Sequence, residues 1–142
     1  MPFKFFLLAT LAFCLFFGCA ARFSRAKNLG VNAGKLTPCP GSPNCVSSQA
    51  EDEPHKVAPS SLKAAAPETM AAIAGLVREM PRTTLVTVTD NYLHAECRSA
   101  LFRFVDDLEV YIDEGESVIH FKSASRTGYS DFGVNRDRKS VV

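Results

Sequence analysis

Polar side chains are concentrated in the segment 123–136. Its two arginines carry planar guanidinium groups, which can hold a carboxylate or a phosphate through two parallel hydrogen bonds. Gly128 and Gly133 allow the segment to bend around a ligand. We therefore predict that this segment binds a small anionic ligand or an envelope protein through five residues, namely Arg126, Tyr129, Asp131, Asn135 and Arg136.

The same segment also has a structural interpretation. Arg126 can pair with Asp106 or Asp107 and so fix a long loop onto a sheet. Asp131 can cap a terminal helical turn, because its carboxylate accepts hydrogen bonds from backbone N–H groups. The sequence leaves both interpretations open.

The histidines suggest a catalytic alternative. His94 or His120 can act as a general base that Asp106 or Asp107 orients, as in a hydrolase with a His/Asp site on the sheet face. The sequence contains no nucleophile elbow, phosphate loop or zinc-protease motif, so catalytic residues stay unassigned and no cofactor is expected. His94, Glu96 and His120 are also an alternative ligand set for a metal, although we predict no metal site.

Three cysteines, Cys39, Cys45 and Cys97, follow the apolar N-terminal segment. The residues between Cys39 and Cys45 are rich in Pro, Gly, Ser and Asn, which favour a tight loop that brings two sulfur atoms together. We predict a Cys39–Cys45 disulfide in an oxidising compartment, with Cys97 as a buried, unpaired thiol. A metal site that uses these cysteines and a histidine is the alternative, but the spacing exceeds that of a zinc knuckle.

The N-terminus has the pattern of an export signal. Lys4 precedes an apolar run over residues 5–21, and Cys19 lies where such a segment is cut. This resembles a bacterial lipobox, whose cysteine takes a diacylglyceryl group on sulfur and becomes the new N-terminus. Two alternatives are an uncleaved anchor helix, since about 20 apolar residues span a bilayer, and ordinary cleavage after Ala20 or Ala21.

These patterns divide the chain into a signal segment (1–18), a lipidated basic tether (19–38) and one α+β domain (39–142). Arg22, Arg25, Lys27 and Lys35 make the tether basic, so it can lie against anionic lipid headgroups. The formal net charge of the chain is only +1, which argues against nucleic acid as a partner.

Prolines and apolar spacing predict one main helix between Pro67 and Pro81, because Met70, Ile73 and Val77 fall on one helical stripe. The apolar period then becomes two, which predicts strands at about 85–89, 92–98, 107–112 and 117–123. We expect an α+β fold in which a small antiparallel sheet of about four strands packs on the helix, after an irregular, disulfide-bearing N-terminal segment. The other sheet face is predicted to be solvated and to carry His94, Glu96, Arg98, Glu109, Tyr111, His120 and Lys122.

Three strings, at 39–48, 92–107 and 123–136, occur together in a recognisable order. Through them the chain resembles the domain-of-unknown-function 1499 family of bacteria and plant plastids over about residues 29–138. The resemblance implies an export-type location and a small mixed domain, and it implies that relatives continue into a C-terminal helix after residues 133–136. The family supplies no established activity.

We therefore predict an uncharacterised, membrane-anchored envelope lipoprotein that faces the periplasm. Because Ala20 rather than Asp follows Cys19, sorting to the outer membrane is expected. The domain is predicted to be a non-enzymatic binding or interaction module that uses the segment 123–136, and the hydrolase is the alternative.

The first prediction concerns Cys19. The change Cys19→Ser removes the sulfur atom that would carry the lipid, so the variant should lose the mass of the acyl groups and leave the membrane fraction. Intact mass spectrometry and membrane fractionation measure both effects. An unchanged mass and unchanged fractionation would show that Cys19 is not acylated.

Overall fold

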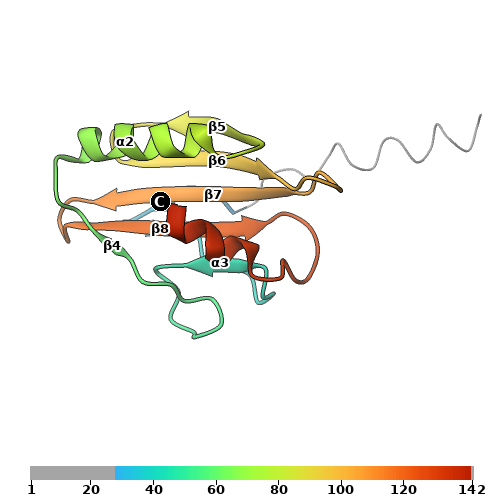
Figure 1. Cartoon of the computed structure of the whole chain (residues 1–142). Helices are drawn as coiled ribbons and strands as arrows, with labels where there is room; N and C mark the ends of the chain where they lie inside the picture. Colours follow the sequence, from blue (N-terminus) through green and yellow to red (C-terminus); the bar gives the residue numbers. More distant parts are fainter. Residues whose placement is uncertain (1–27, 142) are drawn as a thin grey trace, which may run out of the picture.

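The computed structural model describes residues 28–141. The predicted signal segment 1–18, the predicted lipidation site Cys19 and the tether up to residue 27 lie outside the described residues. The main element of the described chain is one six-stranded sheet, hydrogen-bonded in the order β3-β8-β7-β6-β5, with β4 also pairing with β8 (Figure 1). All pairs are antiparallel, between the strands β3 (Cys45–Ser47), β4 (Ser60–Ser61), β5 (Thr83–Val88), β6 (Tyr92–Arg98), β7 (Val105–Asp113) and β8 (Val118–Ser125).

The expected fold of about four strands packed on one main helix is wrong. The structure is mostly antiparallel sheet, with a separate two-stranded sheet of β1 (Val31–Asn32) and β2 (Lys35–Leu36) beside the six-stranded one. Within residues 28–141 there are two short α-helices, α2 (Ala66–Glu79) and α3 (Val134–Arg138). The extra strands were missed because each has only two or three residues, too few to show a period of two.

Helix α2 follows the predicted pattern. Pro67 occupies the first turn, where its missing N–H costs no hydrogen bond, and the helix ends at Glu79, before Pro81. Met70, Ile73 and Val77 form its buried stripe and join the hydrophobic core. Among the described residues, no helix is long and apolar enough to cross a membrane.

The core lies between the helices and one face of the sheet. The register pairs Leu93 with Val110 and Ala95 with Leu108, and all four side chains are fully buried. This confirms the face predicted from the alternation in these strands. Burial of each large aliphatic side chain stabilises the fold by about 1.5–3 kcal/mol.

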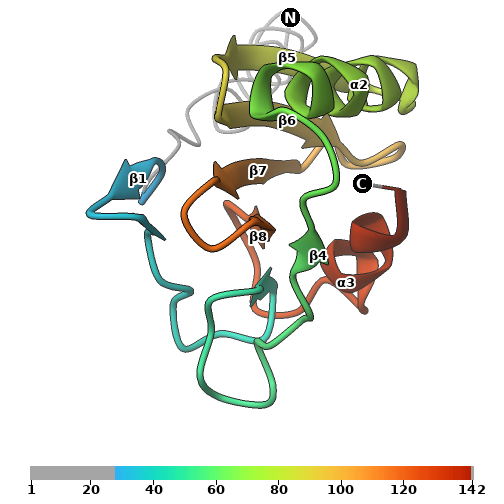
Figure 2. The same cartoon turned by 90° about the vertical axis from the view of Figure 1, so that its left-hand side faces the viewer.

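The opposite face of the sheet is covered rather than solvated, so the prediction of a solvated polar face is wrong. Four polar side chains on it, His94, Glu109, His120 and Lys122, are 6%, 0%, 6% and 2% exposed. Figure 2 shows β1 on this side of the sheet, whereas α2, β4 and α3 lie on the other side. The fold therefore has three layers, with a polar layer under the N-terminal hairpin.

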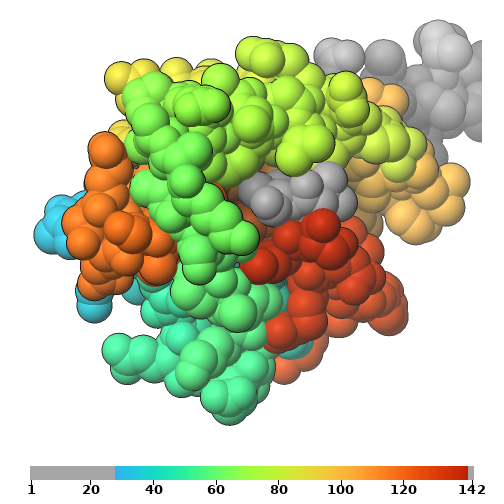
Figure 3. Space-filling view, turned by 60° about the vertical axis from the view of Figure 1, so that its left-hand side comes forward, coloured from blue at the N-terminus to red at the C-terminus, as the bar shows by residue number. Residues whose placement is uncertain are grey.

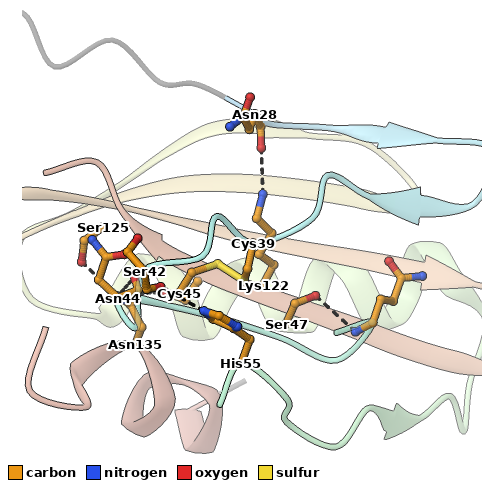
Figure 4. The surroundings of a disulfide bond; sticks show 12 residues. Asn28, Cys39, Ser42, Asn44, Cys45, Ser47, His55, Lys122, Ser125 and Asn135 are labelled. Atoms are coloured by element: carbon orange, nitrogen blue, oxygen red, sulfur yellow. Dashed lines mark hydrogen bonds between the residues drawn. A yellow bond between two sulfur atoms is a disulfide. The ribbon is translucent and has the colours of Figure 1, made fainter. Parts of the chain in front are cut away.

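A buried ion pair joins the N-terminal segment to the sheet. Lys122 Nζ donates to Glu109 Oε2 at 2.9 Å and to the carbonyl oxygen of Asn28 at 2.7 Å (Figure 4). The other oxygen of Glu109 accepts from the N–H of Gly30 at 2.7 Å and from the hydroxyl of Tyr92 at 2.8 Å. The charges of Lys122 and Glu109 are thus neutralised, and both carboxylate oxygens of Glu109 have donors.

The predicted disulfide is confirmed. Cys39 and Cys45 are bonded, with their Cα atoms 5.7 Å apart, and Cys97 is a free, buried thiol. Cys45 begins β3 and pairs with Ala124 of β8. The bond therefore attaches the segment after β2 to the edge of the main sheet (Figure 4).

The second prediction concerns the buried ion pair. The change Lys122→Met leaves the carboxylate of Glu109 buried without its cation, and should lower the free energy of unfolding by about 3–5 kcal/mol. The double variant Glu109→Gln/Lys122→Met removes both charges but keeps an oxygen that accepts from Gly30 and Tyr92. It should be more stable than the single variant in equilibrium urea unfolding. Equal stability of the two variants would contradict this account.

Candidate binding site

The segment 123–136 begins in β8, forms a loop over residues 126–133 and enters α3. The five residues predicted to bind a ligand lie in different environments. Four of them hold parts of the fold together through their polar groups, and one, Tyr129, is 75% exposed.

Arg126 lies on the covered polar face of the sheet and is nearly buried. Its Nε donates to Asp107 Oδ2 at 2.8 Å, and its Nη2 donates to Asp107 Oδ1 and to Glu96 Oε1, each at 2.6 Å. The pairing with Asp107 confirms the structural interpretation of this arginine. Burial raises the pKa of Asp107, but hydrogen bonds from Arg126 and His94 outweigh burial and lower it overall.

His94 and Asp107 form the kind of pair that the hydrolase alternative requires. His94 Nε2 lies 2.7 Å from Asp107 Oδ1. Both side chains are buried, however, and Arg126 occupies both oxygens of the carboxylate. The pair therefore has no open face toward a substrate, and its geometry fits a structural role.

His120 lies in a different part of the sheet from His94 and Glu96. Its Nδ1 is 3.1 Å from Ser48 Oγ, and burial lowers the pKa of the imidazole. Among the described residues, the group whose ligand atoms lie close enough to hold a metal is His120 with Asp113 and Glu116, within 4.8 Å of one another. The carboxylate of Asp113 already accepts from the backbone N–H of Glu116 at 3.1 Å, which closes the turn between β7 and β8.

Asn135 connects α3 to the sheet and is fully buried. Its Oδ1 accepts from Ser123 Oγ at 2.5 Å, and its Nδ2 donates to the carbonyl oxygen of Asn44 and to Ser125 Oγ, each at 3.0 Å (Figure 4). Asp131 accepts from the backbone N–H of Asn135 at 2.8 Å at the start of α3, as its structural interpretation predicts. Both side chains therefore position the last helix.

Arg136 is exposed and fixes a neighbouring loop. Its two terminal nitrogens donate to the carbonyl oxygens of Lys56 and Pro54 at 2.8 Å and 2.9 Å. Arg126 binds carboxylates on the sheet instead. The two guanidinium groups thus have separate partners in the fold and do not form a joint anion clamp.

The exposed part of the segment includes large apolar side chains. Tyr129 and Phe132 are 75% and 96% exposed, and a second loop, 99–104, carries further exposed apolar side chains. Both loops lie at the same end of the sheet, where β6 ends, β7 begins and β8 ends (Figure 1). We call the residues 99–104 and 126–134 the loop end, and its large exposed apolar residues are Leu101, Phe102, Phe104, Tyr129, Phe132 and Val134.

The backbone of the loop end contains two residues in the left-handed conformation. Arg103 and Phe132 both have φ of 55°, in the left-handed region that bulky residues rarely adopt. Such a conformation costs about 1–3 kcal/mol and persists only where neighbouring structure holds it. Phe102 and Phe104 stack with ring centroids 5.5 Å apart. The aromatic side chains are thus presented by ordered turns.

A groove of about 600 Å³ opens beside the loop end, between the last turn of α2 and α3. Its lining includes Leu76, Met80, Ala100 and Val134. Figure 3 shows α2 and the C-terminal residues on one face of the molecule. Cys97 also lines the groove, but burial raises the pKa of its thiol, so it is a weak nucleophile.

Arg138 lies at the inner side of this groove. Its guanidinium donates to Asp106 Oδ2 at 3.0 Å and to the oxygens of Asn135 and Ser123 at 2.7 Å and 2.8 Å. Its charge is balanced by Asp106, and the groove lining combines apolar residues with the charged side chains of Glu79, Arg82 and Arg98.

This arrangement defines a small antiparallel-sheet domain with exposed aromatic side chains beside a groove. The chain belongs to the domain-of-unknown-function 1499 family, since the family model described as "Protein of unknown function (DUF1499)" matches residues 35–140. No curated protein and no solved structure matches the chain.

Sequence reasoning identified the loop 126–133 but missed Leu101, Phe102 and Phe104. The signal was the apolar string 101–104, which stands between two strands where a turn rich in polar residues is expected. Apolar residues in a turn are either buried by another element or exposed for binding. The sequence alone does not distinguish these two cases.

The third prediction compares two arginines of the segment 123–136. Arg126→Lys keeps the charge but loses the planar fork that binds Asp107 and Glu96, so it should lower the free energy of unfolding by about 1–3 kcal/mol. Arg136→Lys also loses a fork, but its two bonds to the carbonyl oxygens of Lys56 and Pro54 are exposed, so the change should cost less, about 0.5–1 kcal/mol. Urea unfolding of both variants measures the difference. If Arg126→Lys is as stable as Arg136→Lys, the buried network does not stabilise the fold.

Proposed function

We propose that this protein is a membrane-anchored envelope lipoprotein and acts as a non-enzymatic binding module, with the exposed part of the segment 123–136 as its binding surface. The observation that carries the proposal is the exposure of Tyr129 and Phe132 in one loop, and of Phe102 and Phe104 in the other loop, at the same end of the sheet. The polar groups of Arg126, Asp131, Asn135 and Arg136 are used within the fold, so recognition falls to the aromatic side chains of the loop end.

Exposed aromatic side chains favour binding for a physical reason. They offer a large apolar area at a low cost in conformational entropy, and they dominate the energetics of many interfaces. Several of them at one end of the sheet are the kind of exposed apolar surface that marks an interaction site. A binding role therefore explains a surface that would otherwise reduce solubility.

The disulfide supports the proposed location. A bond between Cys39 and Cys45 persists in an oxidising compartment such as the periplasm, whereas the reducing cytosol keeps thiols free. The lipobox-like Cys19 and the basic residues after it supply the proposed anchor. The domain would then face the periplasm at the end of its tether.

The hydrolase alternative has less support. His94 and Asp107 are buried, and Arg126 already binds the carboxylate. The imidazole of His120 contacts Ser48, whose hydroxyl also accepts from the backbone N–H of Phe121 at 2.9 Å. Both histidines are thus held within the covered layer of the sheet.

The fourth prediction tests the binding surface in intact cell envelopes. A photo-crosslinking benzoylphenylalanine at position 132 should form a discrete adduct with the partner, because this side chain projects from the loop end. The matched control is the same group at position 88, where Val88 is 43% exposed at the opposite end of the sheet. Mass spectrometry of the adducts should show several-fold more product at position 132. Equal yields at the two positions would contradict a binding role of the loop end.

A further inference from the structure

We propose that the loop end rests on the bilayer that holds the anchor, with its aromatic side chains in the interface of an anionic lipid surface. The inference rests on the proposed function, because it requires that the chain be anchored through its N-terminal segment. It identifies the partner of the binding surface as the lipid surface itself.

The side chains of the loop end match those of proteins that lie on a membrane. Leu101, Phe102, Phe104 and Phe132 are exposed apolar groups that can enter the boundary between headgroups and acyl chains. Tyr129 combines an apolar ring with a hydroxyl group, and such side chains are enriched at the headgroup level. Two loop tips together offer several such groups on one side of the molecule.

The charge around the loop end fits an anionic surface. Arg82 and Arg103 are exposed, and residues 98–105 contain no acidic residue. Arg98, which pairs with Glu96 at 2.9 Å, adds a partly exposed guanidinium at the end of β6. Basic residues near anionic headgroups are attracted to the surface within a Debye length.

Two acidic groups at this end of the molecule, Asp131 and Asp106, have partners. Asp131 accepts hydrogen bonds from the backbone N–H groups of Gly133 and Asn135 at 3.1 Å and 2.8 Å. Asp106 pairs with Arg138 at 3.0 Å. Repulsion from a negative surface is therefore offset by neighbouring positive charge.

The anchor is close enough for this arrangement. Asn28 is bound to Lys122, which lies three residues, or about 10 Å, before the end of β8 at Ser125. The residues 19–27 that precede Asn28 reach at most about 30 Å when fully extended. The lipid on Cys19 and the loop end can thus enter the same leaflet, with Arg22, Arg25 and Lys27 between them.

A second copy of the chain fits this surface less well. An interface related by two-fold symmetry would bring the same patch of each copy together, so Arg82 and Arg103 would add positive charge to both sides of it. Like charges that meet in an interface oppose association. An anionic lipid surface instead complements both the apolar centre and the basic surroundings of the loop end.

The absence of tryptophan from the sequence allows a direct test. The changes Phe132→Trp and Val88→Trp each introduce one fluorescent side chain, at the loop end and at the opposite end of the sheet. The full-length chain is reconstituted through its own anchor into vesicles of phosphatidylcholine and phosphatidylglycerol. Lipids with brominated acyl chains quench a tryptophan that enters the bilayer.

We expect the Phe132→Trp protein to be quenched several-fold more strongly than the Val88→Trp protein, and its emission to shift to shorter wavelength. Adding Arg103→Glu to Phe132→Trp should reduce the quenching in anionic vesicles. Lys63→Glu, the same change of charge in an exposed residue before α2, is the matched control and should leave the quenching unchanged. Unchanged thermal unfolding of each variant shows that the fold is retained.

Equal quenching at positions 132 and 88, or no quenching at either, would overturn the inference. If position 132 is not quenched but forms a crosslink to an envelope protein, the proposed binding module stands and its lipid partner is rejected. Flotation of the same vesicles tests the anchor separately. A chain that does not float with them would reject the anchor and, with it, this inference.

Discussion

The buried ion pair between Glu109 and Lys122 is the constraint on which the covered polar layer depends. A lone charge at either position would be strongly destabilising, so each residue requires the other and requires donors or acceptors for its remaining sites. The N-terminal segment supplies these through Asn28 and Gly30. Because the pair crosses adjacent strands, it also fixes β8 beside β7 in one register.

The same logic explains why the polar segment 123–136 does not present its charges to solvent. Arg126 and Asp107 compensate each other on the covered face, and Arg138 and Asp106 do so on the side of the helices. Each pairing attaches the last part of the chain to the sheet. The fold thus places much of the segment's hydrogen-bonding capacity inside, and its exposed loop carries Tyr129 and Phe132.

Sequence patterns predicted the helix and strands that are long enough to show a periodic spacing of apolar residues. The stripe of Met70, Ile73 and Val77 is long enough to identify α2, and the alternation in β6 and β7 correctly identified the core face. Alternation cannot show what covers the other face, because His94 and Lys122 fit a solvated sheet and a polar layer equally well. The short strands β3 and β4 left no periodic signal. In the candidate site, the structural interpretations of Arg126 and Asp131 were correct. Phe102 and Phe104 were missed, because the exposure of a side chain depends on the whole fold.

The two ends of the sheet differ in a way that follows from this distribution of polar groups. At the end where β7 turns into β8, the turn carries Asp113, Glu114 and Glu116 and is negative. At the other end, Arg103 of the loop end and Arg82 just before β5 are exposed, and the loop end also exposes aromatic side chains. A domain with one acidic end and one basic, aromatic end has a preferred orientation next to an anionic surface, because the field attracts one end and repels the other. A short tether would reinforce this orientation by limiting the distance that the domain can move away.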